Sequence, residues 1–397
     1  MTDNNENKVL NVPHLRFPEF SGEWEKCKVS DLLDFYSTNS LSWEQLEYDT
    51  NAMMNLHYGL IHVGLPTMVD LAKDKLPNIK ENNMPKNFEL CKEGDVAFAD
   101  ASEDTNEVAK TVEFFNLAGK NVVCGLHTIH GRDNKHKTVV GFKGYAFSSA
   151  AFHNQIRRIA QGTKIYSIST KNFFECYIGL PSKPEQSKIA TLLRLIDERI
   201  ATQNKIIEDL KKLKSAITDL LFHSIADAHT IRLGEIAHIT NGAGDVQDAN
   251  TEHQEDWYPF FDRSEELKWF PTYSFDKEAV IYAGEGQSFY PRYYNGKFAL
   301  HQRCYAITDF ASCIIPKYCY HFMNTLNSYF VRNSVGSTVP SLRMDIFQKV
   351  EIRLPPIPKQ QHICKIIDAF YTKLEVEQRG ISILQELKQF LLSQMFI

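Results

Sequence analysis

The feature that most constrains this chain is an internal repeat with a period of 174 residues. Within residues 143–222, 16 of 80 positions are identical to the residue 174 positions later. The match is closest where residues 162–189 align with residues 336–363. This period is far longer than the roughly 20–50 residues of solenoid repeats. We therefore expect two copies of one module, and two copies indicate two similar things to bind.

The composition is that of a soluble globular protein of two or three domains. The 397 residues are 43% hydrophobic and 23% charged, which is ordinary for such proteins. No run reaches the roughly 18 apolar residues that a membrane span needs, and the polar, acidic N-terminus has no signal-peptide core. The eight cysteines are scattered without a CxxC pair, so we expect reduced thiols in a cytoplasmic protein that makes no membrane contact.

Basic residues are concentrated in two stretches, although the net charge is −5. Residues 120–174 contain nine Lys or Arg and one acid, Asp133, and residues 288–344 contain six Lys or Arg and one acid, Asp309. The two stretches occupy equivalent places in the two repeats. Localised basic surface is what a polyanion requires, so the pattern favours double-stranded DNA as a partner.

Each module begins with a globular body, about residues 16–182 and 228–356. Alternating apolar and polar runs predict many short strands and a few helices. We expect a half-buried strand at the start of each body, in segments 24–32 and 231–236. Further expected strands are 96–99, 121–124 and 279–283, and expected helices are 149–160 and 315–332. Asn295-Gly296 between aromatic residues predicts a two-residue hairpin turn.

Each body ends at prolines, and a long helical pattern follows both times. Proline is tolerated at a helix start but not inside a helix. Apolar residues then recur at steps of three and four over about five heptads, which is typical of a coiled coil. One polar residue interrupts each seam, Gln203 and its repeat equivalent Glu377. The predicted seam residues are Ile189, Leu192, Ile196, Ile200, Ile207, Leu210, Leu213, Ile217 and Leu220, then Ile363, Ile367, Phe370, Leu374, Ile381, Leu384, Leu387, Leu391 and Met395.

These patterns predict an α+β fold with two target-binding bodies related by a pseudo-twofold repeat. The expected domains are a first body at 1–182, a first long helix at 183–224, a second body at 225–356 and a second long helix at 357–397. We expect the two helices to pair as an antiparallel coiled coil that separates the bodies like a ruler. The alternative is two amphipathic helices that pack on separate cores.

Motifs for catalysis are weak. Gly242-Ala-Gly244 lacks the third glycine of a dinucleotide fingerprint. Asp256, Asp262 and Glu266-Leu-Lys268 only loosely resemble a nuclease triad. The acidic run at 95–107 is more typical of a solvated loop than of a metal site. His127, His130 and His136 have no cysteine or carboxylate at a useful spacing for zinc. We therefore expect no catalytic residue, no metal and no cofactor.

The basic residues are better candidates for a binding site, because Lys and Arg neutralise phosphates and Arg is the commonest reader of guanine. Gly162-Thr-Lys164 and Gly336-Ser-Thr338 are flexible segments that allow backbone approach to a phosphate. The alternative is that each is a turn into a core strand, with Ile165 and Ile168, or Val339 and Leu342, buried. Residues 290–297 interleave aromatic and basic side chains, as a surface hairpin or a base-contacting one. The predicted DNA-binding residues are Lys143, Arg157, Arg158, Lys164, Lys171, Arg292, Arg303, Lys317, Arg332 and Arg343.

Several segments together resemble a known family. The chain opens with Arg16-Phe17-Pro18-Glu19-Phe20 and Trp24-Glu25, and it repeats a Gly-Thr/Ser…Ser…Phe…Ile-x-Leu-Pro pattern. Both long helices begin with Pro-x-Gln-x-x-Ile, as Pro184–Ile189 and Pro358–Ile363. The last two patterns occur in the same order in both halves of the chain. With this arrangement, the chain resembles the DNA-specificity (S) subunit of type I restriction–modification enzymes over essentially its whole length.

The resemblance implies a non-catalytic subunit of a bacterial defence complex. Each body would be a target-recognition domain that reads one half of a split DNA site. The helices would set the spacing and dock two methyltransferase subunits, to which restriction subunits attach, and the methyl donor, ATP and metal would belong to those partners. Two other classes stay open on the residues alone: a stand-alone DNA-modifying enzyme, and a coiled-coil interaction scaffold without DNA readout.

Overall fold

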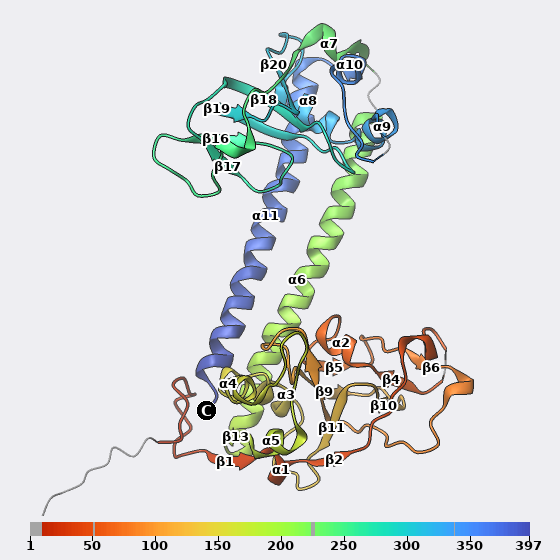
Figure 1. Ribbon diagram of the computed structural model, residues 1–397, viewed down its shortest axis with the longest axis vertical. Coiled ribbons are helices and arrows are strands. Elements are labelled where there is room, and N and C mark those ends of the chain that lie inside the picture. The colour runs from red at the N-terminus through yellow and green to blue at the C-terminus, as the bar shows by residue number, and fades with distance from the viewer. Residues whose placement is uncertain (1–9, 51, 224–226, 337) are drawn as a thin grey trace, which may run out of the picture. The chain divides into compact units, whose positions relative to one another are not determined.

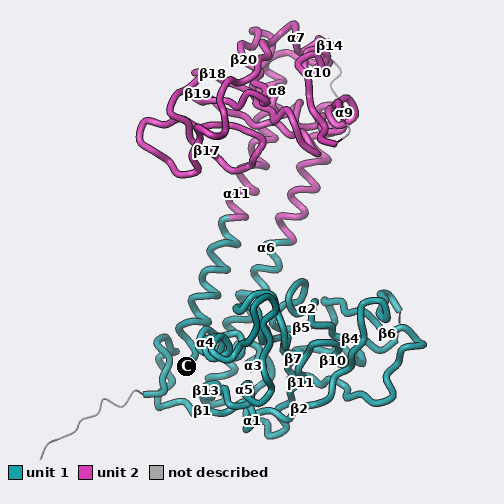
Figure 2. The backbone as a smooth tube through the Cα atoms, viewed as in Figure 1, with its two compact units in different colours: residues 1–204, 379–397 teal, residues 205–378 magenta. Residues whose placement is uncertain are grey.

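The chain folds into two compact units, each built from segments that are distant in the sequence. The computed structural model describes residues 10–50, 52–223, 227–336 and 338–397. Unit 1 holds the chain up to Asn204 together with Arg379–Ile397, and unit 2 holds Lys205–Gln378 (Figure 2). Among the described residues, no helix has the length and apolar character that crossing a bilayer requires.

Unit 1 contains a five-stranded sheet, a four-stranded sheet and two smaller pairs of strands. The five-stranded sheet has the order β2-β11-β7-β9-β5, and the four-stranded sheet has the order β10-β4-β6-β3. The strands of unit 1 are β1 (Glu25–Lys28), β2 (Asp34–Tyr36), β3 (Leu46–Glu47), β4 (Met54–Leu56), β5 (Met68–Asp70), β6 (Asn78–Ile79), β7 (Val96–Ala99), β8 (Ala101–Ser102), β9 (Thr111–Asn116), β10 (Val122–Cys124), β11 (Thr128–Arg132), β12 (Tyr166–Ser167) and β13 (Tyr177–Leu180).

Helices pack beside the five-stranded sheet and form the main core of unit 1. This core is rich in phenylalanine, with Phe98 from β7 in edge contact with Phe147 and Phe173. A separate apolar cluster lies between the two sheets and includes Leu56 and Phe114. The short helices of unit 1 are α1 (Val29–Leu32), α2 (Tyr58–His62), α3 (Phe142–Phe147), α4 (Ala150–Ile159) and α5 (Thr170–Glu175).

Unit 2 is built around a six-stranded sheet of order β15-β20-β18-β19-β16-β17 (Figure 1). Its core includes Tyr282 and Tyr318, whose hydroxyls donate to the carbonyl oxygens of Met323 and Arg353. The strands are β14 (His229–Arg232), β15 (His238–Asn241), β16 (Tyr258–Phe261), β17 (Lys268–Phe270), β18 (Phe275–Ala283), β19 (Arg292–Leu300), β20 (Cys304–Thr308) and β21 (Glu351–Leu354). The short helices are α7 (Leu233–Ile236), α8 (Pro316–Met323), α9 (Asn327–Asn333) and α10 (Met344–Gln348).

The repeat is visible in how each body closes. In unit 1 the opening strand β1 pairs antiparallel with β13, the last strand before the first long helix. In unit 2 β14 pairs in the same way with β21. The predicted opening strands are therefore confirmed, although each changes to a short helix, α1 or α7, before the predicted strand ends. The strands expected at 96–99, 121–124 and 279–283 are also present.

The hairpin turn predicted at Asn295-Gly296 is wrong. Both residues lie inside β19, where Gly296 is opposite Lys277 of β18. The turn between these strands is residues 284–291 instead, which contain Gly284, Gly286 and Pro291. The helix expected at 315–332 is also divided, into α8 and α9, because the chain turns at residues 324–326.

The two long helices are confirmed as α6 (Lys183–His223) and α11 (Ile357–Gln394). The seam prediction is right for most positions and wrong for Leu213, Leu220 and Leu387, whose side chains are exposed. The buried faces instead include Leu193 and Phe222, which the heptad register did not assign to the seam.

Each unit contains the beginning of one long helix and the end of the other, so the two helices pair antiparallel within each unit. In unit 1, Ile189 and Leu193 of α6 share a core with Leu391 and Met395 of α11. Lys388 of α11 also forms an ion pair with Asp197 of α6 at 2.6 Å. In unit 2, Phe222 near the end of α6 shares the core with Ile363 and Ile367 of α11.

A matching phenylalanine anchors the end of each long helix. Phe222 of α6 packs edge-on against Tyr318 and Phe322 of unit 2. Its repeat equivalent Phe396, just after α11, packs edge-on against Trp24 and lies against Phe142 in unit 1. The end of α6, which follows the first body in sequence, therefore packs into the body of unit 2. The end of α11, which follows the second body, packs into the body of unit 1.

A buried glutamine fixes the beginning of α6. The side-chain oxygen of Gln186 accepts a hydrogen bond from the N–H of Val139 at 2.9 Å. Its amide group donates to the carbonyl oxygens of Lys137 at 3.2 Å and Pro181 at 2.9 Å. These bonds satisfy backbone groups at the junction between the body and the helix, where unpaired polar groups are costly.

Unit 2 repeats this arrangement at the start of α11. The side-chain oxygen of Gln360 accepts from the N–H of Ile315 at 2.8 Å. Its amide group donates to the carbonyl oxygens of Cys313 at 2.8 Å and Pro355 at 2.9 Å. The Pro-x-Gln pattern of the sequence is therefore a repeated structural anchor that joins each helix to its body.

Replacing either glutamine with methionine is expected to destabilise its unit. Gln186→Met or Gln360→Met leaves one N–H and two carbonyl groups unpaired, and each buried unsatisfied group costs about 1–3 kcal/mol. We expect the free energy of unfolding, measured by urea denaturation with circular dichroism, to fall by at least about 2 kcal/mol. The exposed neighbour offers a control, since Gln361→Met should change it by less than about 0.5 kcal/mol. An equally small change at Gln186 or Gln360 would contradict the anchor role.

Candidate nucleic-acid interface

A tight loop at residues 161–167 presents the predicted glycine segment of unit 1. Gln161 and Ser167 exchange backbone hydrogen bonds of 2.9 Å each, which close the loop. Gly162 has a φ of +143°, and a Cβ added to it would lie 1.9 Å from the carbonyl oxygen of Ile165. Only glycine fits this position. The loop is held on the body because Ser167 in β12 pairs with Ala101 in β8.

Unit 2 forms the same loop at residues 335–341, although Ser337 lies outside the described residues. Val335 and Ser341 exchange backbone hydrogen bonds of 2.9 and 2.8 Å. Gly336 has a φ of +103°, and an added Cβ would lie 2.7 Å from the carbonyl oxygen of Val339. Ser341 forms a bridge to Glu285, next to β18. We call residues 161–167 and 335–341 the glycine loops.

Each glycine loop exposes one β-branched apolar side chain at an equivalent position. Ile165 is 62% exposed and Val339 is 46% exposed. The alternative of a turn into a core strand is therefore wrong for these two residues. It is right for Ile168 and Leu342, which are buried. No local pattern distinguishes the exposed pair from the buried pair, because all four residues are apolar.

Four of the predicted cations of unit 1 flank its glycine loop. Arg157 and Arg158 occupy the last turn of α4, Lys164 lies in the loop, and Lys171 lies in α5 just after it. All four are exposed. Arg157 donates to the side-chain oxygens of Asn106 and Asn154, which leave its charge uncompensated. No described carboxylate forms an ion pair with any of the four, so their charge is available to an anionic ligand.

Lys143 does not belong to this exposed set, which corrects the sequence prediction. Its side chain is buried, with 2% of the residue exposed, and its ammonium lies 3.3 Å from the carboxylate of Glu113. Burial raises the pKa of Glu113, while Lys143 and the N–H groups of Gly144 and Gly141 oppose that rise. Lys143 compensates a buried carboxylate because α3 packs against β9. It is therefore a structural residue.

Three of the predicted cations of unit 2 flank the second glycine loop. Arg332 lies in the last turn of α9 before the loop, and Arg343 directly follows Leu342. Arg303 adjoins the same segment, because Gly284 donates its N–H to the carbonyl of Arg303 and accepts from the N–H of Leu342. All three arginines are exposed, although Arg303 forms a 2.7 Å ion pair with Glu285.

The remaining two predicted residues of unit 2 lie elsewhere in that unit. Arg292 begins β19 and donates to the carbonyl oxygen of Ser264. Lys317 forms a 2.8 Å ion pair with Asp368 of α11. Both side chains have partners within the unit and are only partly exposed. The structure therefore gathers seven of the ten predicted residues at the two glycine loops and leaves Lys143, Arg292 and Lys317 apart.

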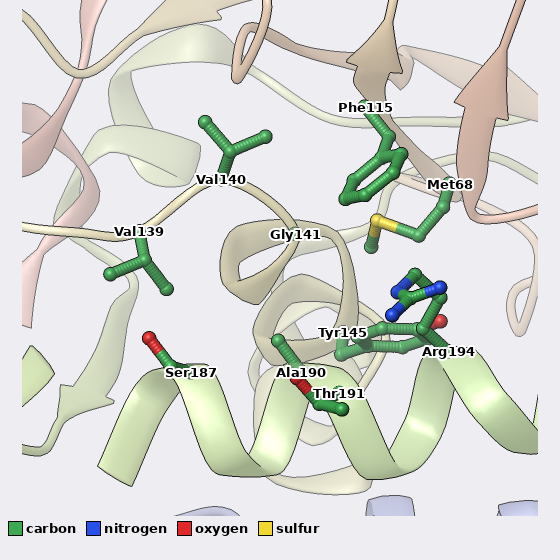
Figure 3. A pocket seen from close by; sticks show the side chains of 10 residues that line it. All are labelled: Met68, Phe115, Val139, Val140, Gly141, Tyr145, Ser187, Ala190, Thr191 and Arg194. Atoms are coloured by element: carbon green, nitrogen blue, oxygen red, sulfur yellow. The ribbon is translucent and has the colours of Figure 1, made fainter. Parts of the chain in front are cut away.

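Two of the cavities in unit 1 differ in size and in their place relative to the first glycine loop. A depression of about 630 Å³ adjoins the first glycine loop and is lined by Tyr58, Val63, His127 and Ile165, among others. A smaller cavity of about 190 Å³ lies at the start of α6, where Ala190, Thr191 and Arg194 face Phe115 (Figure 3). The smaller cavity is below the roughly 300 Å³ of ordinary ligand sites. The larger depression extends the surface beside the exposed Ile165.

The weak catalytic candidates have structural partners. Lys268 forms a 2.7 Å ion pair with Asp262. In the acidic run, Asp95 is buried and accepts hydrogen bonds from His130 and Arg132, and Asp100 lies 3.1 Å from His127. The expectation that the three histidines lack cysteine or carboxylate partners is therefore wrong for His127, which has Asp100. It is also wrong for His130, because folding brings Cys91, Cys124 and Asp95 to it.

Comparison with known protein families accounts for the duplicated architecture. The family model described as the type I restriction modification DNA specificity domain matches the chain twice, at residues 74–212 and 226–389. The chain belongs to this family. Each match contains one glycine loop and the body–helix junction that follows it, so the family signature coincides with the repeat.

Curated specificity subunits show the same relationship at the level of sequence. The EcoDI specificity subunit of Escherichia coli is 31% identical over 165 residues, which cover 41% of this chain and 36% of that protein. A putative type I specificity subunit of Mycoplasma pneumoniae is 25% identical over 224 residues, which cover 52% of this chain and 79% of that protein.

Solved structures share the fold. The S subunit of a type I restriction-modification system from M. genitalium matches with a TM-score of 0.62 and 17% identity, covering 97% of this chain and 99% of that one. A chain from a structural study of type I R-M complex assembly and conformational transition matches with a TM-score of 0.59 and 15% identity, covering 93% of this chain and 96% of that one.

Proposed function

We propose that this chain is the DNA-recognition subunit of a type I restriction–modification complex, in which each unit reads one half of a bipartite target. The observation that carries the proposal is the repeated glycine loop with exposed cations around it in both units. Lys and Arg side chains bind phosphates, and loop backbone at a glycine can approach the duplex closely. Two equivalent loops on one chain fit two tracts of one DNA molecule.

The side chains at the loops also suit base recognition. Arginine donates two hydrogen bonds to guanine in the major groove, and apolar side chains contact the thymine methyl group. Arg158 and Ile165 in unit 1, with Arg332 and Val339 in unit 2, provide both kinds of contact from equivalent positions. The two surroundings differ, since among the described residues unit 1 has a four-stranded sheet and a depression lined by Tyr58 beside its loop. The two half-sites should therefore differ in sequence.

Recognition in this scheme requires no chemistry from the chain itself. The cavity at the start of α6 holds a single charged side chain, Arg194, among its lining residues. The methyl donor, ATP and metal used in modification and cleavage would then be held by the methyltransferase and restriction subunits. The chain supplies specificity, and its two readers are joined by the long helices.

The outward faces of the long helices support docking of two methyltransferase subunits. Ile206 and Leu213 of α6 are one heptad apart and exposed. On α11, Ile383, Leu387 and Phe390 are exposed at heptad spacing. Leu387 is the repeat equivalent of Leu213. Exposed apolar stripes of this kind mark protein-binding surfaces, and two stripes that share this one equivalent position fit two copies of one partner. Restriction subunits would join through those partners.

Charge reversal at one arginine of each glycine loop is expected to weaken DNA binding. Arg158→Glu or Arg332→Glu removes a phosphate contact and adds a repulsive charge, which should lower affinity about tenfold and reduce the salt slope by about one. Fluorescence anisotropy would measure both quantities for the complex with its methyltransferase subunit, on a duplex that carries a site which the complex methylates. Lys75→Glu and Lys359→Glu provide controls with the same change in net charge.

Unchanged affinity and salt slope in both loop variants would contradict the placement of the interface. A scaffold that does not read DNA would show no preference between that duplex and one of unrelated sequence. Methylation of DNA by the purified chain alone would instead indicate a stand-alone DNA-modifying enzyme.

Glutamate in an outward stripe is expected to remove one methyltransferase subunit. Ile206→Glu with Leu213→Glu should abolish docking at one stripe, and Ile383→Glu with Phe390→Glu should abolish it at the other, because each change places charges in an apolar contact. Native mass spectrometry should show two methyltransferase subunits per chain before the changes and one after either pair. Exposed polar positions on the same helices, Ser215→Glu and Gln385→Glu, should keep both. Full occupancy in both double variants would exclude these stripes as the docking sites.

A further inference from the structure

Three potential metal ligands meet inside unit 1, away from the glycine loop. Cys91, Cys124 and His130 each offer one ligand atom, and these atoms all lie within 4.8 Å of one another. All three residues are buried. The two cysteine sulfurs are 3.6 Å apart. They come from different segments, with Cys91 before β7, Cys124 at the end of β10 and His130 within β11.

The separation of the sulfurs fits a shared metal ion. Two thiolates at about 2.3 Å from a tetrahedral zinc ion lie roughly 3.8 Å from each other. A disulfide would bring the sulfurs to about 2.05 Å. The 3.6 Å between the sulfurs of Cys91 and Cys124 is therefore close to the separation expected at a zinc ion.

His130 provides a second and independent observation. Its side chain is completely buried, and its Nε2 lies 2.7 Å from Asp95. Its Nδ1 has no hydrogen-bond partner among the described residues. A buried polar atom without a partner is unusual. Histidine ligands of metals commonly use one ring nitrogen for the metal and place the other against a carboxylate, which fixes the ring. Asp95 occupies that supporting position.

The charges around the cluster are also balanced for a divalent ion. Two thiolates neutralise Zn²⁺, and a neutral imidazole adds no charge. Asp95 is already paired with Arg132, whose guanidinium lies 2.8 Å from it. Soft thiolate ligands with imidazole select zinc over magnesium or calcium. A buried ion of this kind would leave no uncompensated charge in the core.

We propose that unit 1 holds a zinc ion on the thiolates of Cys91 and Cys124 and the Nδ1 atom of His130. Binding displaces the two thiol protons into solvent. The site differs from the His127, His130 and His136 combination considered from sequence, because His127 is exposed and faces Asp100.

The zinc ion would join the two sheets of unit 1. Cys124 belongs to β10 of the four-stranded sheet, and His130 belongs to β11 of the five-stranded sheet. Cys91 is tied to β10 because its N–H donates to the carbonyl of Val122. The chain between β10 and β11 contains His127, which lines the depression beside the first glycine loop. The ion would therefore hold this part of the recognition surface in place.

Metal analysis of the full chain tests the proposal directly. The chain, purified without chelator, should contain one zinc ion as measured by inductively coupled plasma mass spectrometry. After removal of zinc, added Co²⁺ should give the thiolate charge-transfer and tetrahedral d–d absorption bands. Cys91→Ser and Cys124→Ser should each lower the bound metal at least about tenfold. Cys176→Ser, a change at a buried cysteine elsewhere in unit 1, should leave it at one per chain.

The wild-type chain alone can overturn the proposal, whatever the variants do to folding. Absence of zinc with no cobalt bands would exclude the site. Thiol titration of the unfolded chain distinguishes the competing state, because a Cys91–Cys124 disulfide would leave six reactive thiols of the eight cysteines. These measurements are independent of DNA binding, so the zinc site and the proposed function can fail separately.

Discussion

The buried amide at the start of each long helix is the interaction on which the architecture depends. Gln186 and Gln360 each bind one N–H and two carbonyl groups of the adjacent body. Buried backbone groups at such a junction are costly to leave unpaired. By pairing them, each glutamine holds the start of its helix in place on the body. Phe222 and Phe396 then fix the far end of each helix in a body. The repeat thus encodes attachment at both ends of both helices.

Much of this fold follows from local sequence patterns. Prolines before a sustained apolar periodicity predicted α6 and α11, and the 174-residue shift predicted that the two junctions would match. Short alternating runs predicted β7, β10 and β18 because the side chains of a strand alternate between faces. A local sequence signal fails to predict the structure where pairing with another strand opposes it. The turn residues Asn295-Gly296 lie inside β19, where pairing with β18 along its length outweighs the turn preference.

The candidate binding surface was less predictable, because the exposure of a side chain depends on contacts between distant segments. Charge counts selected Arg158 and Arg332, which are exposed, but also Lys143, which is buried beside Glu113. Apolar character assigned Leu213 and Leu387 to the seam, although they face outward. The Cys91, Cys124 and His130 cluster had no signature because its members are 33 and 6 residues apart rather than in a short motif. Such features require the fold.

The central claim is that one chain carries two different readers joined by two long helices. Its most direct test is single-molecule methylation mapping of DNA from cells in which this chain is the sole specificity subunit beside its methyltransferase. The account predicts one asymmetric motif, with two unlike half-sites separated by a spacer of constant length and unspecified sequence. A continuous motif, two identical half-sites or a spacer of variable length would contradict it.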